Sequence, residues 1–355
     1  MIKHTSILVL LVCCIACSKE PVRSNPISEN MYFPPVTNTI WETKSIANLN
    51  WNQNAVQPLL DYLELKNSKS FMIIVNGRIV IENYFNNHSA STNWYWASAG
   101  KTLTTAVTGI AEQENLIDIN AKVSTYLGPG WTSEPLNKEN LITCKNLLTM
   151  TSGIEDILNG DGVAPGNLQY KADAGTRWAY HNVYVKLQDV IAQASEQTWS
   201  NYFNTKLRDK IGMDGAWLTI DNSSVYFSTT RSMARFGLLV LNNGKWENNT
   251  IINPNYCTAA TTSSQIINQA YGYLWWLNGK SSYRLPQSQQ EFQGSLIPAG
   301  PKDMFMALGK NDQKIYVIPS KKMVVVRMGE AADNVNLALS DFDNALWTKI
   351  NALYN

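Results

Sequence analysis

The segment SAGKTLTTAVTGIA, residues 98–111, is the most informative stretch of the sequence. Its apolar residues fall at positions 103, 106, 107, 110 and 111, which is the spacing of a helix. The opposite face carries Ser98, Lys101 and three threonines, so the lysine is the only charge in the segment. Because exposed helix faces normally mix charges of both signs, we expect this helix to be buried on both sides.

Ser98 and Lys101 share one face of that helix, and together they predict a nucleophile and its base. Burial disfavours the ammonium form, so we expect a lowered pKa for Lys101, which could then take the serine proton. As the first residue of the helix, Ser98 would also offer its backbone N–H to a developing oxyanion. The alternative is an N-cap serine followed by a surface lysine, since Ser-x-x-Lys alone occurs by chance.

Other hydrolytic chemistry is disfavoured by the remaining side chains. The sequence has three histidines, at positions 4, 88 and 181, and no Gly-x-Ser-x-Gly elbow that would suit a Ser-His-Asp triad. It also has no His-Glu-x-x-His motif and no cysteine–histidine cluster that would indicate a zinc site. We therefore predict a serine–lysine mechanism that uses no metal and no cofactor.

Working outward from this helix, both ends of the body predict β-structure. A helical pattern over residues 56–63 precedes two β-rich runs that flank Asn76-Gly77, a strong hairpin signal. Three more β-rich runs cover residues 304–308, 313–318 and 323–327, and residues 98–245 are mostly helical in pattern. The last helix should bury Ala338, Phe342, Ala345, Leu346 and Leu353. We predict an α+β fold: an antiparallel sheet built from both chain ends, flanked by helices, with a mostly helical insert at roughly 115–245.

Several motifs resemble those of the serine β-lactamase and penicillin-binding-protein superfamily, in its class C-like branch of esterases, peptidases and nylon-oligomer hydrolases. Residues 96–101 (WASAGK) resemble the first motif, and residues 177–182 (RWAYHN) resemble the Tyr-x-Asn motif. Further similar segments are LLTMTSG at 147–153, FGLL at 236–239 and YGYLWW at 271–276. The motifs follow the expected order from about residue 51 onward. The resemblance implies a β-lactamase/transpeptidase-like fold and hydrolysis through an acyl-enzyme.

The resemblance also implies roles for Tyr180 and Asn182. Tyr180 would exchange protons among the serine, the lysine and the leaving group, and Asn182 would hydrogen-bond Lys101 or the substrate. Tyr-x-Asn also occurs at Tyr84 and Tyr202, where we expect core packing because those copies fall in a hairpin and an amphipathic helix. The alternative for Tyr180 is a buried aromatic residue with a satisfied hydroxyl group.

The third motif departs from the pattern of the superfamily. Lys-Thr-Gly or His-x-Gly is expected on the innermost strand, and Ala-Leu-Gly at 307–309 stands in its place. Gly309 would still let backbone approach a ligand, and Ser152 would line the same cleft. The Lys310 backbone N–H would be the second oxyanion donor beside Ser98, with its side chain in an exposed turn. Without the cation that usually holds a carboxylate, we expect an ester or amide substrate more than a β-lactam. A Lys310 side chain reaching inward would reverse that expectation.

The composition limits the classes of molecule that the chain is expected to bind. The chain of 355 residues is 45% hydrophobic and 16% charged with a net charge of +1, which provides no basic field for a nucleic acid. We expect a small-molecule ester, amide or peptide substrate and no nucleic acid. Beyond the N-terminal segment only Cys144 and Cys257 remain, which could be buried thiols or one bridge.

The N-terminus is predicted to be a targeting segment. Residues 1–16 have the pattern of a signal peptide, and Ile15-Ala16-Cys17 resembles a lipobox. Cys17 would then carry the lipid anchor, and we expect the protein to contact the membrane only through this lipid. Cys14 could be the processed residue instead, and ordinary cleavage without a lipid is the other alternative. We predict a flexible tether over residues 17–50 and a hydrolase domain over 51–355, exported to the bacterial cell envelope.

These features are compatible with three functions. The leading prediction is a serine hydrolase acting on ester or amide bonds, related to β-lactamases, with Lys101 and Tyr180 as the base. A penicillin-binding-like sensor or binding module with little turnover is the alternative, motivated by the altered third motif. A structural lipoprotein without a site would leave the buried lysine unexplained.

Overall fold

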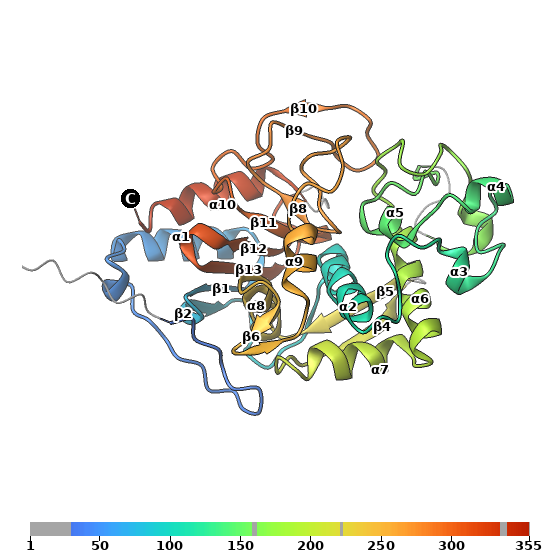
Figure 1. Cartoon of the computed structure of the whole chain (residues 1–355). Helices are drawn as coiled ribbons and strands as arrows, with labels where there is room; N and C mark the ends of the chain where they lie inside the picture. The colour runs from blue at the N-terminus through green and yellow to red at the C-terminus, as the bar shows by residue number, and fades with distance from the viewer. Residues whose placement is uncertain (1–29, 158–161, 221–222, 334–338, 355) are drawn as a thin grey trace, which may run out of the picture. The chain divides into compact units, whose positions relative to one another are not determined.

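A six-stranded antiparallel sheet forms the centre of the fold, as Figure 1 shows. The computed structural model describes residues 30–157, 162–220, 223–333 and 339–354. The predicted signal segment 1–16, which contains Cys14, lies outside the described residues, and so do Cys17 and the rest of the predicted tether up to residue 29. The strand order is β2 (Arg78–Tyr84), β1 (Ser68–Val75), β13 (Met323–Gly329), β12 (Gln313–Ile318), β11 (Phe305–Gly309) and β8 (Trp276–Leu277). Strands from both ends of the chain therefore share one sheet, as predicted.

The β1–β2 hairpin follows from its turn. Asn76 and Gly77 both have positive φ, 51° and 81°, which is the geometry of the two-residue turns that match the twist of paired strands. In β1 nearly every side chain is buried, because helices cover both faces of the sheet. Ile73 faces Ile81 in β2 on one side and Val325 in β13 on the other, so β1 lies inside the sheet.

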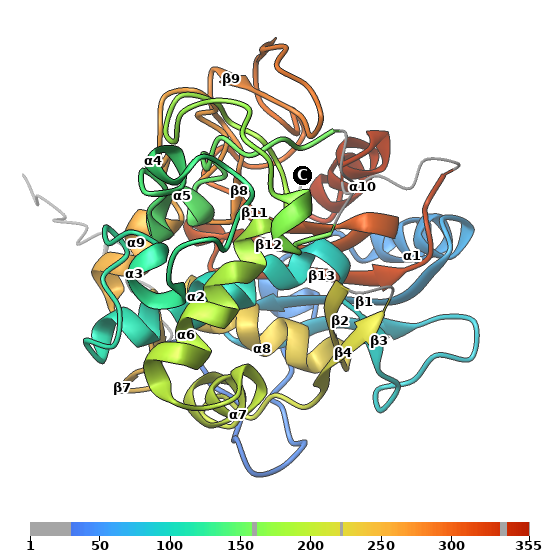
Figure 2. The same ribbon diagram turned by 90° about the vertical axis from the view of Figure 1, so that its right-hand side faces the viewer.

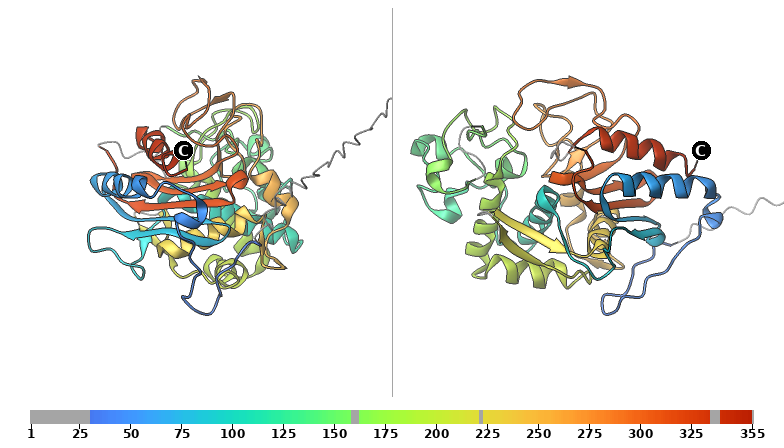
Figure 3. Two further views of the ribbon diagram at one scale, coloured as in Figure 1. Left: turned by 90° about the vertical axis from the view of Figure 1, so that its left-hand side faces the viewer. Right: turned by 180° about the vertical axis from the view of Figure 1, so that it is seen from behind.

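Helices α1 (Val56–Leu65) and α10 (Asp341–Asn351) lie side by side over one face, as Figure 3 shows. Helix α8 (Thr230–Leu241) covers the other face. A Cβ at Gly237 would come within 2.5 Å of the Val324 side chain, so glycine there lets α8 pack tightly on the strands. The predicted face of the last helix is partly wrong: Ala345 is exposed, Leu353 is buried beyond the end of α10, and Ala338 lies outside the described residues.

The part of the chain that faces the viewer in Figure 2 is built around α2 (Lys101–Gln113). Its other helices are α3 (Ser124–Leu127), α4 (Leu136–Glu139), α5 (Cys144–Leu148), α6 (Lys186–Ser195), α7 (Trp199–Phe203) and α9 (Pro254–Ala260). The short strand pairs are β6 (Lys245–Trp246) with β7 (Asn249–Thr250), and β9 (Ser282–Tyr283) with β10 (Phe292–Gln293). Within the described residues, no helix is both long and apolar enough to span a membrane.

A second, three-stranded sheet lies within this region, and the expectation of a mostly helical insert missed it. Its order is β3 (Trp94–Tyr95), β5 (Ser223–Ser228) and β4 (Ala216–Ile220), all antiparallel. Strand β3 leads directly into the segment that carries Ser98. The Trp96 backbone N–H donates to the Tyr226 carbonyl oxygen at 2.8 Å, so β5 fixes the start of that segment.

The prediction of a flexible tether is wrong for residues 31–50, which belong to the folded unit of residues 31–355. Trp41 and Ile46 are buried, and the Trp41 indole N–H donates to the Gly77 carbonyl oxygen at 2.7 Å. The Arg235 guanidinium of α8 donates to the carbonyl oxygens of Pro34 and Pro35. The carbonyl groups of these prolines thus satisfy a buried cation and attach the segment to α8.

Candidate active site

Ser98 lies in a 3-10 turn, Ala97–Gly100, that runs directly into α2. Every residue of α2 from Lys101 to Ala111 is buried, so the prediction that both faces of this helix are covered is confirmed. Lys101 is only 3% exposed, whereas Ser98 is half-buried and can be reached from outside. The rim of the site therefore carries the hydroxyl group and its interior carries the amine.

The side chains of Ser98, Lys101, Tyr180 and Asn182 meet at this turn, although they come from two separate segments. The Lys101 Nζ donates to Ser98 Oγ at 3.0 Å and to Asn182 Oδ1 at 3.1 Å. It also lies 4.8 Å from the centre of the Tyr180 ring. The sequence predicted this grouping, while the roles of the four residues and the protonation state of Lys101 stay predictions.

Neighbouring rings and backbone hold the segment with Tyr180 in place. The Tyr180 ring stacks on Trp276 at 5.7 Å and meets the edge of Tyr271 at 6.2 Å. Just before it, the Ala179 N–H donates to the Met150 carbonyl oxygen at 2.8 Å. Just after it, His181 Nδ1 accepts from the Val183 N–H at 3.1 Å and caps the 3-10 turn Asn182–Val185. Packing on both sides thus fixes the phenol against the lysine.

Left-handed backbone occurs at Ala97 beside Ser98 and at two apolar residues of the neighbouring loops, Met150 and Leu274. Ala97, Met150 and Leu274 have φ values of 47°, 57° and 60°. Such conformations cost free energy and persist only where the surroundings determine them. Ala97 directly precedes Ser98. The Met150 carbonyl oxygen accepts from the N–H of Ala179, the residue before Tyr180. The Leu274 N–H donates to the Leu148 carbonyl oxygen at 3.0 Å. These conformations could not be predicted from the sequence, because no local signal marks an alanine, methionine or leucine with positive φ.

Strand β11 ends beside the Ser98 turn. A Cβ on Gly309 would lie 2.5 Å from the Trp96 carbonyl oxygen and 3.0 Å from the Ala99 nitrogen. Gly309 thus permits a close approach to the backbone of the Ser98 turn, and its place in the substrate cleft stays a prediction. Lys310 is exposed at the following turn, as expected for its side chain. That its backbone N–H is an oxyanion donor stays a prediction.

The turn after Gly309 is held in an unusual shape. Asn311 and Asp312 both have left-handed φ values, 58° and 59°. The buried Arg327 Nη1 donates to both of their carbonyl oxygens at 3.0 Å. Asn311 Nδ2 donates to the Tyr95 hydroxyl at 2.8 Å, which ties the turn to the strand that leads into Ser98. These bonds fix the spacing between Lys310 and the Ser98 turn.

A buried ionic cluster supports the same turn from the α10 side of the sheet. The Lys314 Nζ lies 3.1 Å from Asp312 and 2.8 Å from Asp343. Tyr316 donates to the Asp343 carboxylate at 2.6 Å. Burial lowers the pKa of Arg327 to about 10, while Asp312 is the carboxylate that most opposes this shift. Two anions and two cations are therefore packed together without solvent.

Ser152 is 4% exposed, and its hydroxyl accepts from the Ile154 N–H at 3.3 Å. The structure thus gives this side chain a role in its own loop, and contact with a substrate stays a prediction. Neighbouring Gly153 has a φ of 84°, and a Cβ there would lie 2.1 Å from the Ala172 carbonyl oxygen. The loop therefore requires glycine at this position for packing.

The other candidates of the sequence have structural roles. Tyr84 donates to Glu82 at 2.6 Å and Tyr202 donates to Glu114 at 2.9 Å, so neither takes part in the cluster around Lys101. Cys144 and Cys257 are both buried free thiols, which settles the choice between thiols and a bridge. Burial raises the pKa of the Cys144 thiol to about 12.

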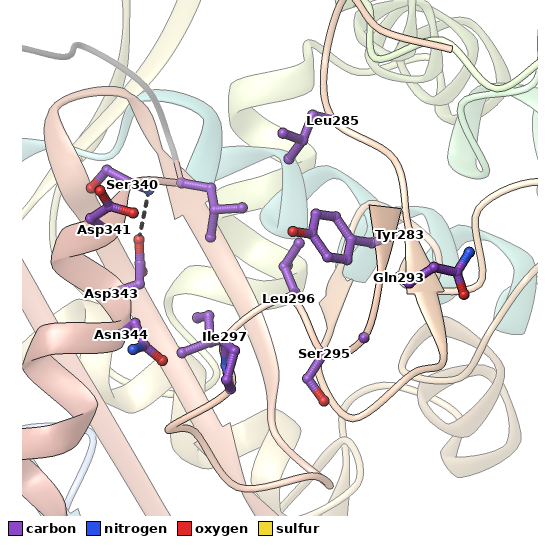
Figure 4. A pocket seen from close by; sticks show the side chains of 13 residues that line it. Tyr283, Leu285, Gln293, Ser295, Leu296, Ile297, Ser340, Asp341, Asp343 and Asn344 are labelled. Atoms are coloured by element: carbon purple, nitrogen blue, oxygen red, sulfur yellow. Dashed lines mark hydrogen bonds between the residues drawn. The ribbon is translucent and has the colours of Figure 1, made fainter. Parts of the chain in front are cut away.

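A cavity of about 460 Å³ lies between residues 283–298 and the start of α10, as Figure 4 shows. Its lining includes Tyr283, Leu296 and Asp343, and none of the predicted site residues. The Asp343 carboxylate there accepts from the Ser340 N–H at 3.0 Å and already holds Lys314 and Tyr316. This cavity is therefore not the place where Ser98 would react.

An antiparallel sheet between helices, with a buried helix that begins at a Ser-x-x-Lys turn, defines the β-lactamase-fold serine hydrolases. The chain belongs to the beta-lactamase family, whose model matches residues 67–345. An uncharacterized protein of Alkalihalophilus pseudofirmus is 26% identical over 299 residues, which cover 73% of this chain and 82% of that protein.

Solved structures of this fold are similar along most of the chain. A Bacillus anthracis protein with the provisional name 6-aminohexanoate-dimer hydrolase is 20% identical, with a TM-score of 0.69 over 91% of this chain and 89% of the other. A family VIII carboxylesterase is 15% identical, with a TM-score of 0.63 over 84% of this chain and 96% of the other. At these identities the likeness shows the fold: β-lactamase/transpeptidase-like, α+β.

Proposed function

We propose that the protein cleaves an ester or amide bond through an acyl-enzyme on Ser98. The observation that carries this proposal is the 3.0 Å contact between Lys101 Nζ and the half-buried Ser98 hydroxyl. A serine is a weak nucleophile unless a neighbouring base takes its proton, and a buried lysine beside a tyrosine can form such a base.

The proposed reaction has two steps. Lys101 and Tyr180 together accept the Ser98 proton while Ser98 Oγ bonds to the carbonyl carbon of the substrate. The backbone N–H groups of Ser98 and Lys310 hold the oxyanion, and the leaving group departs with a proton from Tyr180. Water then attacks the acyl group by the reverse proton path and frees Ser98. Asn182 keeps the lysine directed at Ser98 through its 3.1 Å hydrogen bond.

We propose an ester or an amide without a carboxylate handle as the substrate class. Support comes from Ala307-Leu308-Gly309, which offers no cation in the third motif, and from the exposed position of Lys310. The solved structures of this fold include a carboxylesterase and a class C β-lactamase at similar TM-scores, so this choice of substrate rests on the third motif. From the sequence alone we also propose export and a lipid anchor at Cys17, which palmitate labelling of Cys17→Ala in cells would test.

One experiment tests the nucleophile. The full chain, in detergent, is incubated with a fluorophosphonate probe and with p-nitrophenyl acyl esters, and intact mass is compared with that of Ser98→Ala. We expect rapid labelling and ester turnover in the parent and neither in Ser98→Ala. Slow labelling without turnover would favour the sensor instead. Labelling that persists in Ser98→Ala would remove Ser98 from its role.

A further inference from the structure

Tyr184 lies against Lys101, and the mechanism proposed above gives it no role. We propose that Tyr184 is a positioning residue whose ring favours the ammonium form of Lys101 and so sets the pH at which Ser98 becomes active. This inference rests on the proposed function and deepens it. It concerns how the base is prepared and adds no new step to the reaction.

The geometry around the Lys101 amine carries the inference. Its Nζ lies 4.6 Å from the centre of the Tyr184 ring and 4.8 Å from the centre of the Tyr180 ring. The face of an aromatic ring attracts a cation at such distances, and more strongly where water is excluded. Tyr184 is 5% exposed and Lys101 is 3% exposed, so this contact is shielded from solvent.

Both rings come from one short segment, which makes the arrangement reproducible. Tyr180 precedes the 3-10 turn Asn182–Val185 and Tyr184 lies within it, so one short segment brings both rings to the Lys101 amine. The Asn182 side chain accepts from the same amine. Two ring faces and two oxygen acceptors thus surround a lysine whose burial alone would disfavour its charge.

Other titratable groups lie near α2 in the described residues. Tyr271 meets the Tyr180 ring edge-on, and burial, with a smaller effect of Tyr180 and Tyr184, holds the pKa of Tyr271 well above its ordinary value. His181 lies between the two tyrosines in the chain, and its Nδ1 accepts from the Val183 N–H. On elements packed against α2, Tyr256 of α9 contacts Thr105, Lys186 of α6 pairs with Asp189, and Lys206 pairs with Glu114. Lys310, after β11, is exposed. Tyr180 and Tyr184 are therefore the titratable groups that lie over the amine.

The Tyr184 ring would thereby set the pH above which the Lys101–Tyr180 pair can act as a base. Before the Lys101–Tyr180 pair can accept the Ser98 proton, it has to release one proton of its own. A ring that stabilises the ammonium form keeps this proton bound to higher pH. Without the ring, the proton leaves at lower pH, and the acid limb of kcat/KM moves down by about one pH unit.

The test compares Tyr184→Leu with Tyr184→Phe in the full chain. The acid limb of kcat/KM for a p-nitrophenyl ester and the rate of fluorophosphonate labelling are measured across pH. In Tyr184→Leu we expect the acid limbs of both pH profiles, that of kcat/KM and that of the labelling rate, to move to lower pH. Tyr184→Phe keeps the ring face, so we expect its limb at the parent position. Fluorinated phenylalanines at position 184 keep the shape but weaken the face, and should shift the limb stepwise.

Tyr256→Leu is the matched control, because Tyr256 is an equally buried tyrosine that packs on α2 at Thr105 and Gly109. It should lower the melting temperature and leave the acid limb in place. An unmoved limb in the fluorinated series, or an equal shift in Tyr256→Leu, would overturn the inference. If the parent itself is not labelled at Ser98, the proposed function fails instead, so the two failures are distinct.

Discussion

At the residue scale, the conformation of Ala97 determines how Ser98 is presented. Its φ of 47° turns the chain sharply between β3 and α2, so the hydroxyl group stands at the rim of the site while the following helix is buried. A non-glycine residue in this region costs about 1–3 kcal/mol. The contacts of Trp96 with Tyr226 and of Ala99 with Trp96 hold the turn in spite of this cost.

A substitution with glycine tests this strain. Glycine adopts positive φ without a steric cost, so we expect Ala97→Gly to leave the free energy of unfolding unchanged or to raise it by up to about 1 kcal/mol. Ala99→Gly is the control in the same turn, because Ala99 is fully buried and has no positive φ. It should lower the free energy of unfolding by about 1–2 kcal/mol. Urea unfolding measures both, and a loss in Ala97→Gly as large as in the control would contradict the strain.

Single residues differ in how well the sequence predicts them. The burial of Lys101 was predictable, because it is the only charged residue in a segment whose two helix faces are otherwise neutral. Helices that are buried on both sides have few charged residues. The contact of Tyr184 with Lys101 was not predictable, because it depends on how a 3-10 turn folds back over α2. The packing of Gly309 against the backbone of residues 96–99 was not predictable for a similar reason, since it joins distant parts of the chain.

At the element scale, the end of β11 and the Ser98 turn act as one unit. We expect Gly309→Ala to reduce kcat by about 100-fold, because an added Cβ would overlap the Trp96 carbonyl oxygen and displace the turn by a fraction of an ångström or more. Stability should fall as well. Steady-state kinetics with a p-nitrophenyl ester and thermal unfolding provide the measurements.

Gly166→Ala is the matched control for that change. Gly166 is exposed, and a Cβ there would have no heavy atom within 4 Å. Both kcat and the melting temperature should stay at the parent values. If Gly309→Ala also retained its kcat, the position of β11 against Ser98 would not matter for the reaction.

Elements with strong local signals were predicted, and elements that depend on distant partners were not. The Asn76-Gly77 turn and the three β-rich runs near the C-terminus indicated the main sheet correctly. Strands β4 and β5 were missed, because β4 is largely exposed and its pattern is weak without its partner. Residues 31–50 were expected to be a tether, since prolines do not reveal that Arg235 binds their carbonyl groups.

At the scale of the whole molecule, Glu134 links stability to pH. Burial raises its pKa to about 7, and repulsion from Glu139 and Asp173 adds to this, while Lys138 opposes it. The folded protein thus keeps a proton that the unfolded chain releases near 4.5. The stability that protonated Glu134 contributes is fully present below pH 4.5 and is lost as the pH rises through about 7. We expect Glu134→Gln to raise the melting temperature above that pKa and to change it little below 4.5.

Glu155 provides a control of opposite sign. Its hydrogen bond with Lys171 holds the pKa of the Glu155 carboxyl group below its usual value, so ionisation favours the folded state. Glu155→Gln should therefore lower the melting temperature at neutral pH and lose its effect in acid. Thermal unfolding of both variants across pH would contradict the assignment of Glu134 if the two curves moved in the same direction.

The pairing of β1 with β13 has a consequence during synthesis. Val75 pairs with Met323, so the ribosome adds about 250 residues before the inner edge of the first hairpin can find its neighbour. At about 5–20 residues per second, the nascent chain waits for tens of seconds with an open strand edge. We expect this protein to depend on a holding chaperone while it is being made, and ribosome-bound chains that stop before residue 323 to aggregate when released.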